Sequence, residues 1–347
     1  MSDQTKLLTT GIGSLPHHNI DSALAYSLKF DIPFLPQIPI RNPWEYMVAS
    51  ALEGLPGLMV EKEGLAFLNV EVWEGRSKSF NDRLSYAFSH SADPNAFESF
   101  EPSSATSSSW QPFLWELQEQ KKTTAKIQLC GPLTAQWALR LSDGKTVDHY
   151  PDLGAQIFKI VLARAIAMGR RLLQQKIKPI LFLDEPGLYG LSPENPKHAI
   201  SVSELSIVIS ALKKEGITVG LHCCSNSDWA KILPLGMDYL SIDTHLSLES
   251  LMKAGPALKT YLNSGGKLSL GVVPTDIASE QQETPKDLTT GLIKALGQSP
   301  DPSLKNQILA SSLLTPACGM ALLTPEMTEE ILSNLLNLKR NILMQST

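Results

Sequence analysis

Four side chains in the sequence are of types that together could hold a transition metal: His222, Cys224, Asp243 and Cys318. Each stands at or just after the end of a short apolar run that predicts a β-strand. On an extended segment, residues two apart face the same side, so His222 and Cys224 can bind one ion while Cys223 points away. Thiolate and imidazole, sometimes with a carboxylate, are the usual ligands of tetrahedral zinc, and soft thiolates disfavour magnesium and calcium. These four residues therefore predict a Zn²⁺ site.

The same residue types also occur for purely structural reasons. A lone cysteine near a strand end is usually a small buried apolar residue, and we interpret Cys130 and Cys223 in this way, with a place behind the metal ligands as the alternative. Asp243 could simply cap a helix. His245 is expected to be a solvated loop residue, with a place in the site as the alternative.

A second signal is the carboxylate pair Asp184 and Glu185, which follows the apolar run Ile180–Leu183. Carboxylates beside a buried strand are costly unless they are used, so one of the two could bind a substrate ammonium. The alternative is a structural pair saturated by backbone N–H groups. In the first predicted loop, Gly11 and Gly13 allow close backbone approach, and free N–H groups there can hold a carboxylate.

Short apolar runs that end in Gly, Pro or polar residues predict eight strands. They are Leu7–Ile12, Pro33–Pro36, Ala125–Cys130, Pro179–Leu183, Thr218–His222, Tyr239–Ile242, Leu268–Val273 and Ala310–Leu314. The predicted helices between and after them are Asp21–Phe30, Leu153–Gln175, Ser203–Glu215, Asp228–Leu233, Leu248–Ser264, Pro285–Leu296 and Pro325–Met344. This alternation predicts an α/β fold, a (β/α)8 TIM barrel, with a doubly wound open sheet as the alternative. In a barrel, the strand ends that carry the metal and carboxylate residues face one mouth.

Residues 37–124 are too long for an ordinary connection and predict an insertion after the second strand, within a single barrel spanning residues 1–347. The insertion contains a predicted helix, Pro43–Glu53, a strand-like run, Leu65–Val72, and the Ser-rich stretch 103–109. We expect part of it to be a flexible lid. A surface excursion without function is the alternative.

Composition excludes several other classes of protein. The chain has 347 residues, 43% of them hydrophobic and 19% charged, which argues against global disorder. The net charge of −5 gives no reason to expect a nucleic-acid or anionic-membrane partner. No apolar run is long enough to span a membrane, and the first eight residues lack the apolar core of a signal peptide, so we expect a cytoplasmic protein. The four cysteines are then expected to be metal-binding, catalytic or buried rather than disulfide-bonded.

Taken together, the strand-end motifs resemble the C-terminal catalytic barrel of cobalamin-independent methionine synthase. The resemblance runs nearly end to end, and its motifs share the family's order and spacing. The matching segments are Thr10–Pro16, Gly131–Thr134 followed by Trp137, Asp184–Pro186, His222 with Cys224, Ser241–Thr244 and Thr315–Gly319.

The resemblance implies a role for each matching residue. His222, Cys224 and Cys318 match zinc ligands, and Asp243 stands where the family carries a zinc-binding glutamate. The Gly13–Ser14 backbone would hold the carboxylate of an amino-acid substrate, and Asp184 would grip its amine. The implied activity is methyl transfer to a homocysteine-like thiol, as in methionine biosynthesis, with His222, Cys224 and Cys318 as the catalytic residues.

The departures from the family bear on the methyl donor. The chain has no room for the second barrel that helps the full-length family hold folate. The stretch 271–276 lacks the histidine that follows the family's seventh strand, and the family's glutamate after strand two is replaced within 37–39. We therefore expect a methyl-corrinoid, free or protein-bound, rather than methyl-folate. Two alternatives remain: a metal-free decarboxylase of the uroporphyrinogen type, and a barrel that binds a corrinoid or thiol without turnover.

Overall fold

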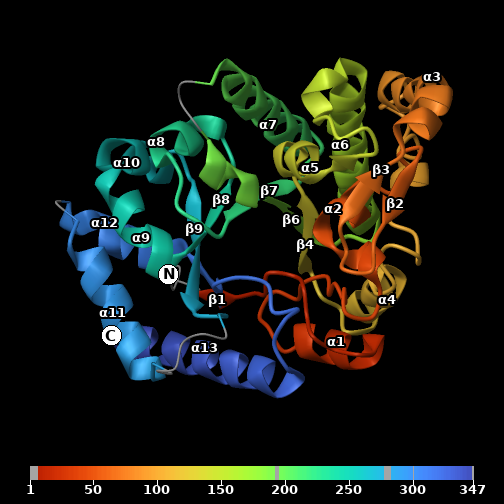
Figure 1. The fold of residues 1–347 in the computed structure, drawn as a ribbon. Coiled ribbons are helices and arrows are strands. Elements are labelled where there is room, and N and C mark those ends of the chain that lie inside the picture. The colour runs from red at the N-terminus through yellow and green to blue at the C-terminus, as the bar shows by residue number, and fades with distance from the viewer. Residues whose placement is uncertain (1–6, 192–194, 277–282, 300, 346–347) are drawn as a thin grey trace.

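The centre of the molecule is a curled parallel sheet of seven strands in the order β1-β10-β9-β8-β7-β6-β4 (Figure 1). The computed structural model describes residues 7–191, 195–276, 283–299 and 301–345. The strands of this sheet are β1 (Leu8–Thr9), β4 (Thr124–Cys130), β6 (Lys178–Asp184), β7 (Thr218–Cys223), β8 (Tyr239–Asp243), β9 (Lys267–Val273) and β10 (Leu313–Pro316). A separate three-stranded sheet contains β2 (Leu58–Val60), β3 (Ala66–Leu68) and β5 (Arg140–Leu141).

Helices lie around the outside of the curled sheet (Figure 1). They are α1 (Ile20–Ser27), α2 (Met47–Ala51), α3 (Val70–Ser89), α4 (Trp110–Glu119), α5 (Pro132–Ala138), α6 (Pro151–Gln174), α7 (Pro196–Lys214), α8 (Trp229–Ile232), α9 (Thr244–Lys253), α10 (Gly255–Asn263), α11 (Pro285–Gly297), α12 (Pro302–Ser311) and α13 (Pro325–Gln345). The first and last helices meet, because the Tyr26 hydroxyl on α1 donates to the Thr328 carbonyl on α13 at 2.9 Å. No helix among the described residues has the length and apolar character needed to cross a membrane.

The segment 32–36, which was predicted as the second strand, lies between the two edges of the seven-stranded sheet. The Ile32 N–H donates to the Thr9 carbonyl of β1 at 3.0 Å, and the Lys126 N–H of β4 donates to the Pro33 carbonyl at 2.8 Å. Phe34 and Lys126 form an isolated parallel bridge. Both edge strands are therefore hydrogen-bonded to one short segment, although that segment is not itself a regular strand.

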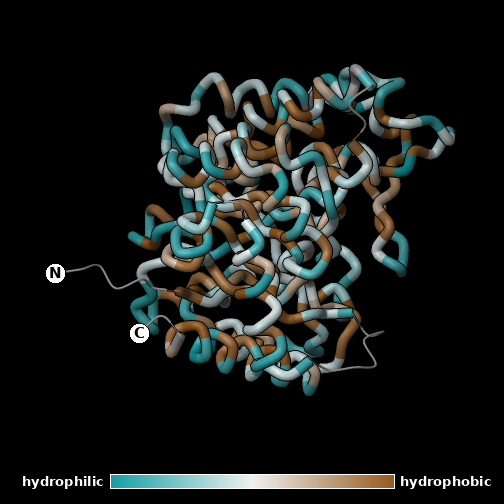
Figure 2. Tube along the Cα trace, turned by 90° about the vertical axis from the view of Figure 1, so that its left-hand side faces the viewer, coloured by the Kyte–Doolittle hydropathy of each residue, from teal (hydrophilic) through white to brown (hydrophobic). Residues whose placement is uncertain are grey.

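Apolar side chains fill both sides of the sheet. The larger core lies between the sheet and the helices, and a smaller cluster of Ile32, Ile180, Phe182, Tyr239 and Leu313 fills the concave inside. Along the chain trace, hydrophobic residues concentrate inside and hydrophilic residues at the periphery (Figure 2). The apolar cluster closes the inside of the sheet below the carboxyl ends of its strands.

Three predicted elements of the sheet-and-helix region are wrong in extent. The predicted strand Ala310–Leu314 overlaps α12, which runs to Ser311, so β10 begins only at Leu313. The predicted helix Leu248–Ser264 is two helices, α9 and α10, with Pro256 at the start of the second, where its missing N–H costs little. The helix predicted from Ser203 begins seven residues earlier, at Pro196.

The insertion has more regular structure than its sequence suggests. The strand-like run Leu65–Val72 contains only β3 before Asn69 caps α3, its side chain accepting from the Val72 N–H at 3.1 Å. The predicted helix Pro43–Glu53 is a 3₁₀ turn followed by the short α2. In the Ser-rich stretch, Ser109 is fully buried. The buried Arg164 on α6 donates to the Glu53 carboxylate at 2.7 Å, which ties the insertion to the helix layer.

Candidate metal centre

Three of the four predicted metal ligands come together. The side chains of His222, Cys224 and Cys318 each offer one ligand atom, and these atoms lie within 4.8 Å of one another. His222 belongs to β7, Cys224 follows it directly, and Cys318 lies two residues beyond the end of β10. His222 is buried and the two cysteines are partly buried. The group could hold a metal ion, and its donors are one imidazole nitrogen and two sulfur atoms.

The side chains of His222 on β7 and Cys224, directly after it, face the same side of the sheet. His222 is in parallel register with Asp184 on β6 and with Ser241 on β8, so the three side chains stand in one row on the inner face of the sheet. Cys223 points the other way, into the core between the sheet and the helices. Its Sγ lies 3.1 Å from the Ser225 carbonyl, and burial raises the pKa of its thiol to about 12. Cys223 is therefore a core residue.

Cys318 is held in place by contacts on both sides. The register between β10 and β9 shifts between Thr315 and Pro316, which turns the chain at the end of the strand. The Ala317 N–H then donates to the Val273 carbonyl at 2.8 Å, and the Met320 N–H donates to the Ser14 carbonyl at 2.9 Å. Gly319 permits this approach, because a Cβ at that position would lie 2.1 Å from the Ser14 Oγ. The loop after β1 and the Cys318 loop are therefore adjacent.

The contact between the two thiols of the group shifts their pKa values in opposite directions. Hydrogen bonds from Cys318 and His222 to the Cys224 thiolate lower the pKa of Cys224 to about 4. The same contact with Cys224, together with burial, raises the pKa of Cys318. Each thiol therefore affects the protonation of the other. A thiolate is the form of cysteine that binds metal.

The predicted fourth ligand, Asp243, lies outside the group. Its Oδ1 accepts hydrogen bonds from the His245 N–H at 2.8 Å and the Leu246 N–H at 3.3 Å, so it caps α9. Burial raises the pKa of its carboxyl, and the Cys224 charge acts in the same direction. The helix-cap alternative is therefore confirmed for Asp243. His245 is exposed, as expected, but it lies in the first turn of α9 rather than in a loop.

The adjacent carboxylates Asp184 and Glu185 have different surroundings. Glu185 is saturated: its Oε1 accepts from the Leu133 N–H, and its Oε2 accepts from the Thr134 N–H and hydroxyl. Asp184 is also buried, but its Oδ1 has no hydrogen-bond partner among the described residues. Burial raises the pKa of Asp184, against the opposing charges of Lys126 and His222. Asp184 is the carboxylate that retains an unused acceptor beside the candidate metal ligands.

A buried lysine that the sequence analysis missed supports the loop after β1. Lys126 on β4 is 2% exposed, and its Nζ donates to the Ile12 carbonyl and to the Gln128 Oε1. Gln128 Nε2 in turn donates to Gln37 Oε1 at 3.1 Å. Burial lowers the pKa of Lys126 to about 8. A lysine inside an otherwise buried strand was a readable signal, because lysine is almost never fully buried without a partner.

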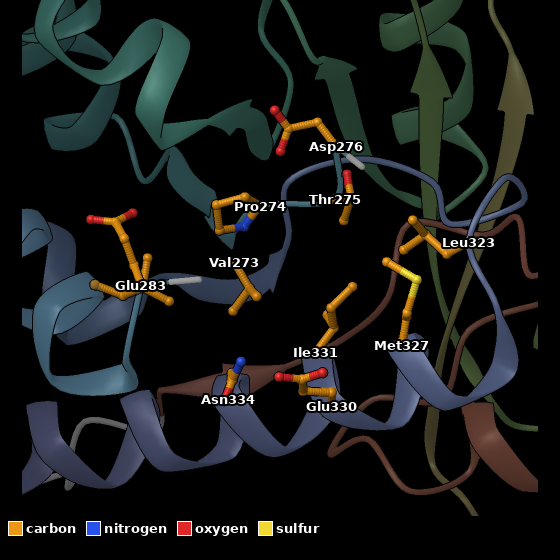
Figure 3. A pocket seen from close by; sticks show the side chains of 11 residues that line it. Val273, Pro274, Thr275, Asp276, Glu283, Leu323, Met327, Glu330, Ile331 and Asn334 are labelled. Atoms are coloured by element: carbon orange, nitrogen blue, oxygen red, sulfur yellow. The ribbon is translucent and has the colours of Figure 1, made fainter. Parts of the chain in front are cut away.

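A small cavity of about 100 Å³ lies between β9, α11 and α13 (Figure 3). Its apolar lining includes Val273, Met327 and Ile331, and carboxylates of Asp276 and Glu330 stand at its wall (Figure 3). Val273 also accepts the Ala317 N–H, so the cavity adjoins the loop that carries Cys318. The end of β9 and the residues after it, including Val273 and Asp276, therefore form one wall of this cavity, and α13 forms another.

Comparisons with known proteins add little to this geometry. No protein-family model matches the chain, and no curated protein matches it. Among solved structures, a protein from Streptomyces avermitilis described as an orotidine 5′-phosphate decarboxylase is similar over 60% of this chain and 76% of its own, with 14% identity and a TM-score of 0.32. A likeness at that score supports no conclusion about function.

Proposed function

We propose that the chain is a zinc-dependent methyltransferase that moves a methyl group to a thiol. The observation that carries the proposal is the convergence of His222, Cys224 and Cys318 at the carboxyl-end edge of a parallel sheet. Two sulfur donors and one imidazole suit zinc. Structural zinc sites are closed by four protein ligands, whereas catalytic sites have three and leave one position open. His222, Cys224 and Cys318 would supply three ligands, whereas Asp243 caps α9. The group therefore fits the catalytic class of zinc site.

The chain's own residues would orient an amino-acid thiol. The unpartnered Oδ1 of Asp184 suits a substrate ammonium, and the Gly13–Ser14 backbone, next to the Cys318 loop, suits its carboxylate. Zinc at the group would lower the pKa of the substrate thiol, so that it is present as thiolate at neutral pH. A sulfur–carbon bond then forms as the bond from the methyl carbon to its donor breaks, and the leaving group keeps the electron pair. Holding both reactants in line supplies much of the rate.

Several finer parts of the proposal come from the resemblance to cobalamin-independent methionine synthase. They are a homocysteine-like acceptor, a place in methionine biosynthesis, and a methyl-corrinoid donor, free or on a corrinoid protein. A cytoplasmic location is proposed separately, from the lack of an apolar signal core in the first eight residues. The resemblance also suggests that the segment 32–36 serves as the eighth strand of a (β/α)8 barrel, and its hydrogen bonds to β1 and β4 support that assignment. The insertion at 37–124 would cover the mouth or contact the donor.

Metal content is the first test. Protein purified without added metal should contain about one zinc per chain by elemental analysis, and Cys224→Ser and Cys318→Ser should lose it. Cys223→Ala is the matched control, because Cys223 is the sequence neighbour of Cys224 but faces the outer core. Retention of zinc by the Cys224→Ser and Cys318→Ser variants, or a folded wild-type protein that refuses added zinc, would overturn the proposal.

Activity is the second test. Homocysteine and other small thiols should be methylated with methylcobalamin as donor, and methyl-folate should be a poor donor. His222→Ala should abolish the reaction, while Cys223→Ala should retain it. A wild-type protein that binds zinc and a thiol tightly without turnover would instead favour the binding-protein alternative.

A further inference from the structure

The imidazole of His222 has a second partner besides the two cysteines. Its Nδ1 lies 3.0 Å from the Oγ of Ser241, which is 1% exposed. The two residues are in register on the adjacent strands β7 and β8, so the contact is set by the pairing of the strands rather than by a loop. Contact with Ser241 occupies Nδ1 and leaves Nε2 as the nitrogen for a metal ion.

We infer that Ser241 is a positioning residue that fixes the ring orientation and the tautomer of His222 for metal binding. When Nδ1 carries the proton and donates it to the Ser241 hydroxyl oxygen, Nε2 presents its lone pair. Metal-bound histidines commonly donate their other ring N–H to a neighbouring acceptor, and loss of that acceptor typically costs 10–100-fold in metal affinity or activity. This inference rests on the proposed metal site and adds a residue that does not itself touch the metal.

The next strand supplies a matched control. Ser269 on β9 is in register with Ser241 and is equally buried, at 1% exposure. Its Oγ has no hydrogen-bond partner among the described residues. Ser241→Ala and Ser269→Ala therefore remove the same hydroxyl from the same row of the sheet, but only the first removes a partner of His222.

The test is the zinc affinity of the purified full-length chain, measured by competition with a chromophoric chelator. We expect Ser241→Ala to weaken zinc binding about 10–100-fold, Ser269→Ala to leave it within about twofold, and Ser241→Thr, which keeps the hydroxyl, to restore most of it. Equal affinities for Ser241→Ala and Ser269→Ala would overturn the inference while leaving the metal site intact. A wild-type chain that binds no zinc would overturn the metal site and the inference together.

A second measurement does not depend on affinity. Nitrogen-15 NMR of the histidine rings, with His222 assigned by its loss in His222→Gln, should show Nδ1 protonated in the wild-type zinc complex. In Ser241→Ala the His222 signals should broaden or shift toward a mixture of ring states, whereas Ser269→Ala should retain the wild-type signals. An unprotonated Nδ1 in the wild-type complex would contradict the assigned role.

Discussion

The adjacent residues Asp184 and Glu185 are both buried carboxylates, but they point into two regions with different hydrogen-bonding partners. Glu185 points to the N-terminus of α5, where two backbone N–H groups and one hydroxyl surround it. Asp184 points to the inside of the sheet, beside Lys126 and His222, and keeps one oxygen without a partner. Both side chains are buried, and burial raises the pKa of both.

The comparison shows which property separates a structural carboxylate from a candidate functional one. Burial and a raised pKa are common to both residues, so neither property distinguishes them. The difference lies in hydrogen bonding: the Glu185 oxygens are fully used by the fold, whereas the Asp184 Oδ1 can still accept a bond from a ligand. Buried polar atoms without partners are rare in folded proteins, so such an atom beside three side chains that could hold a metal ion is informative.

The largest predicted effect is on the free energy of unfolding, when the Glu185 carboxylate at the N-terminus of α5 is removed. Glu185→Ala should lower the free energy of unfolding by about 4 kcal/mol, because it leaves three buried donors without an acceptor. Urea unfolding at pH 5 isolates this loss, since Glu185, with a pKa of about 7, is then neutral and the cost of burying charge does not enter. Gly131→Ala should also destabilise, because its Cβ would lie 2.0 Å from the Glu185 Oε1. A loss below about 1 kcal/mol in Glu185→Ala would remove the structural role of Glu185.

The next effect is the pH dependence of stability. Burial raises the pKa of Glu185 from 4.5 to about 7, so between these values the native state holds a proton that the unfolded state has released. Stability should therefore fall as pH rises from about 4.5 to about 7, by up to about 3 kcal/mol, with no further change from this group above that range. Urea midpoints of the wild type and Glu185→Gln, measured at pH 5 and pH 8, separate this contribution. Parallel pH profiles for the two proteins would contradict it.

The parts of the fold that the sequence predicted are those with local signals. Strands β4, β6, β7, β8 and β9 were predicted to within one residue at each end, because each is a short and largely apolar run between polar or turn residues. The errors arise where two signals compete. Ala310 and its neighbours are apolar enough for a strand, but they continue α12, and the Ser312 hydroxyl bonds back to the Ile308 carbonyl at 2.6 Å.

The candidate site was predictable for a similar reason, and only in part. His222 and Cys224 are two residues apart at one predicted strand end and Cys318 follows the last predicted strand, so in a barrel their meeting could be expected. The role of Ser241 depends on the register between β7 and β8, which one sequence does not specify, and serine is common in such positions for other reasons. Asp243 was open to two interpretations, and the position of the α9 N-terminus decided for the cap.

The smallest predicted effect on stability concerns Asp184, the buried carboxylate with an unpartnered oxygen. Asp184→Asn should change the free energy of unfolding by less than about 1 kcal/mol at pH 7, because the wild-type Oδ1 makes no hydrogen bond that the fold depends on. Glu185→Gln is the matched change of the same chemistry. Glu185→Gln should lower the free energy of unfolding by more than Asp184→Asn does. It places an amide NH₂ against a backbone N–H that has a carboxylate acceptor in the wild type. Both variants replace a buried carboxyl group with the corresponding amide, so urea unfolding of both compares the two positions directly. If Asp184→Asn proves as destabilising as Glu185→Gln, then Asp184 is also required by the fold, and the unpartnered oxygen ceases to be evidence for a ligand.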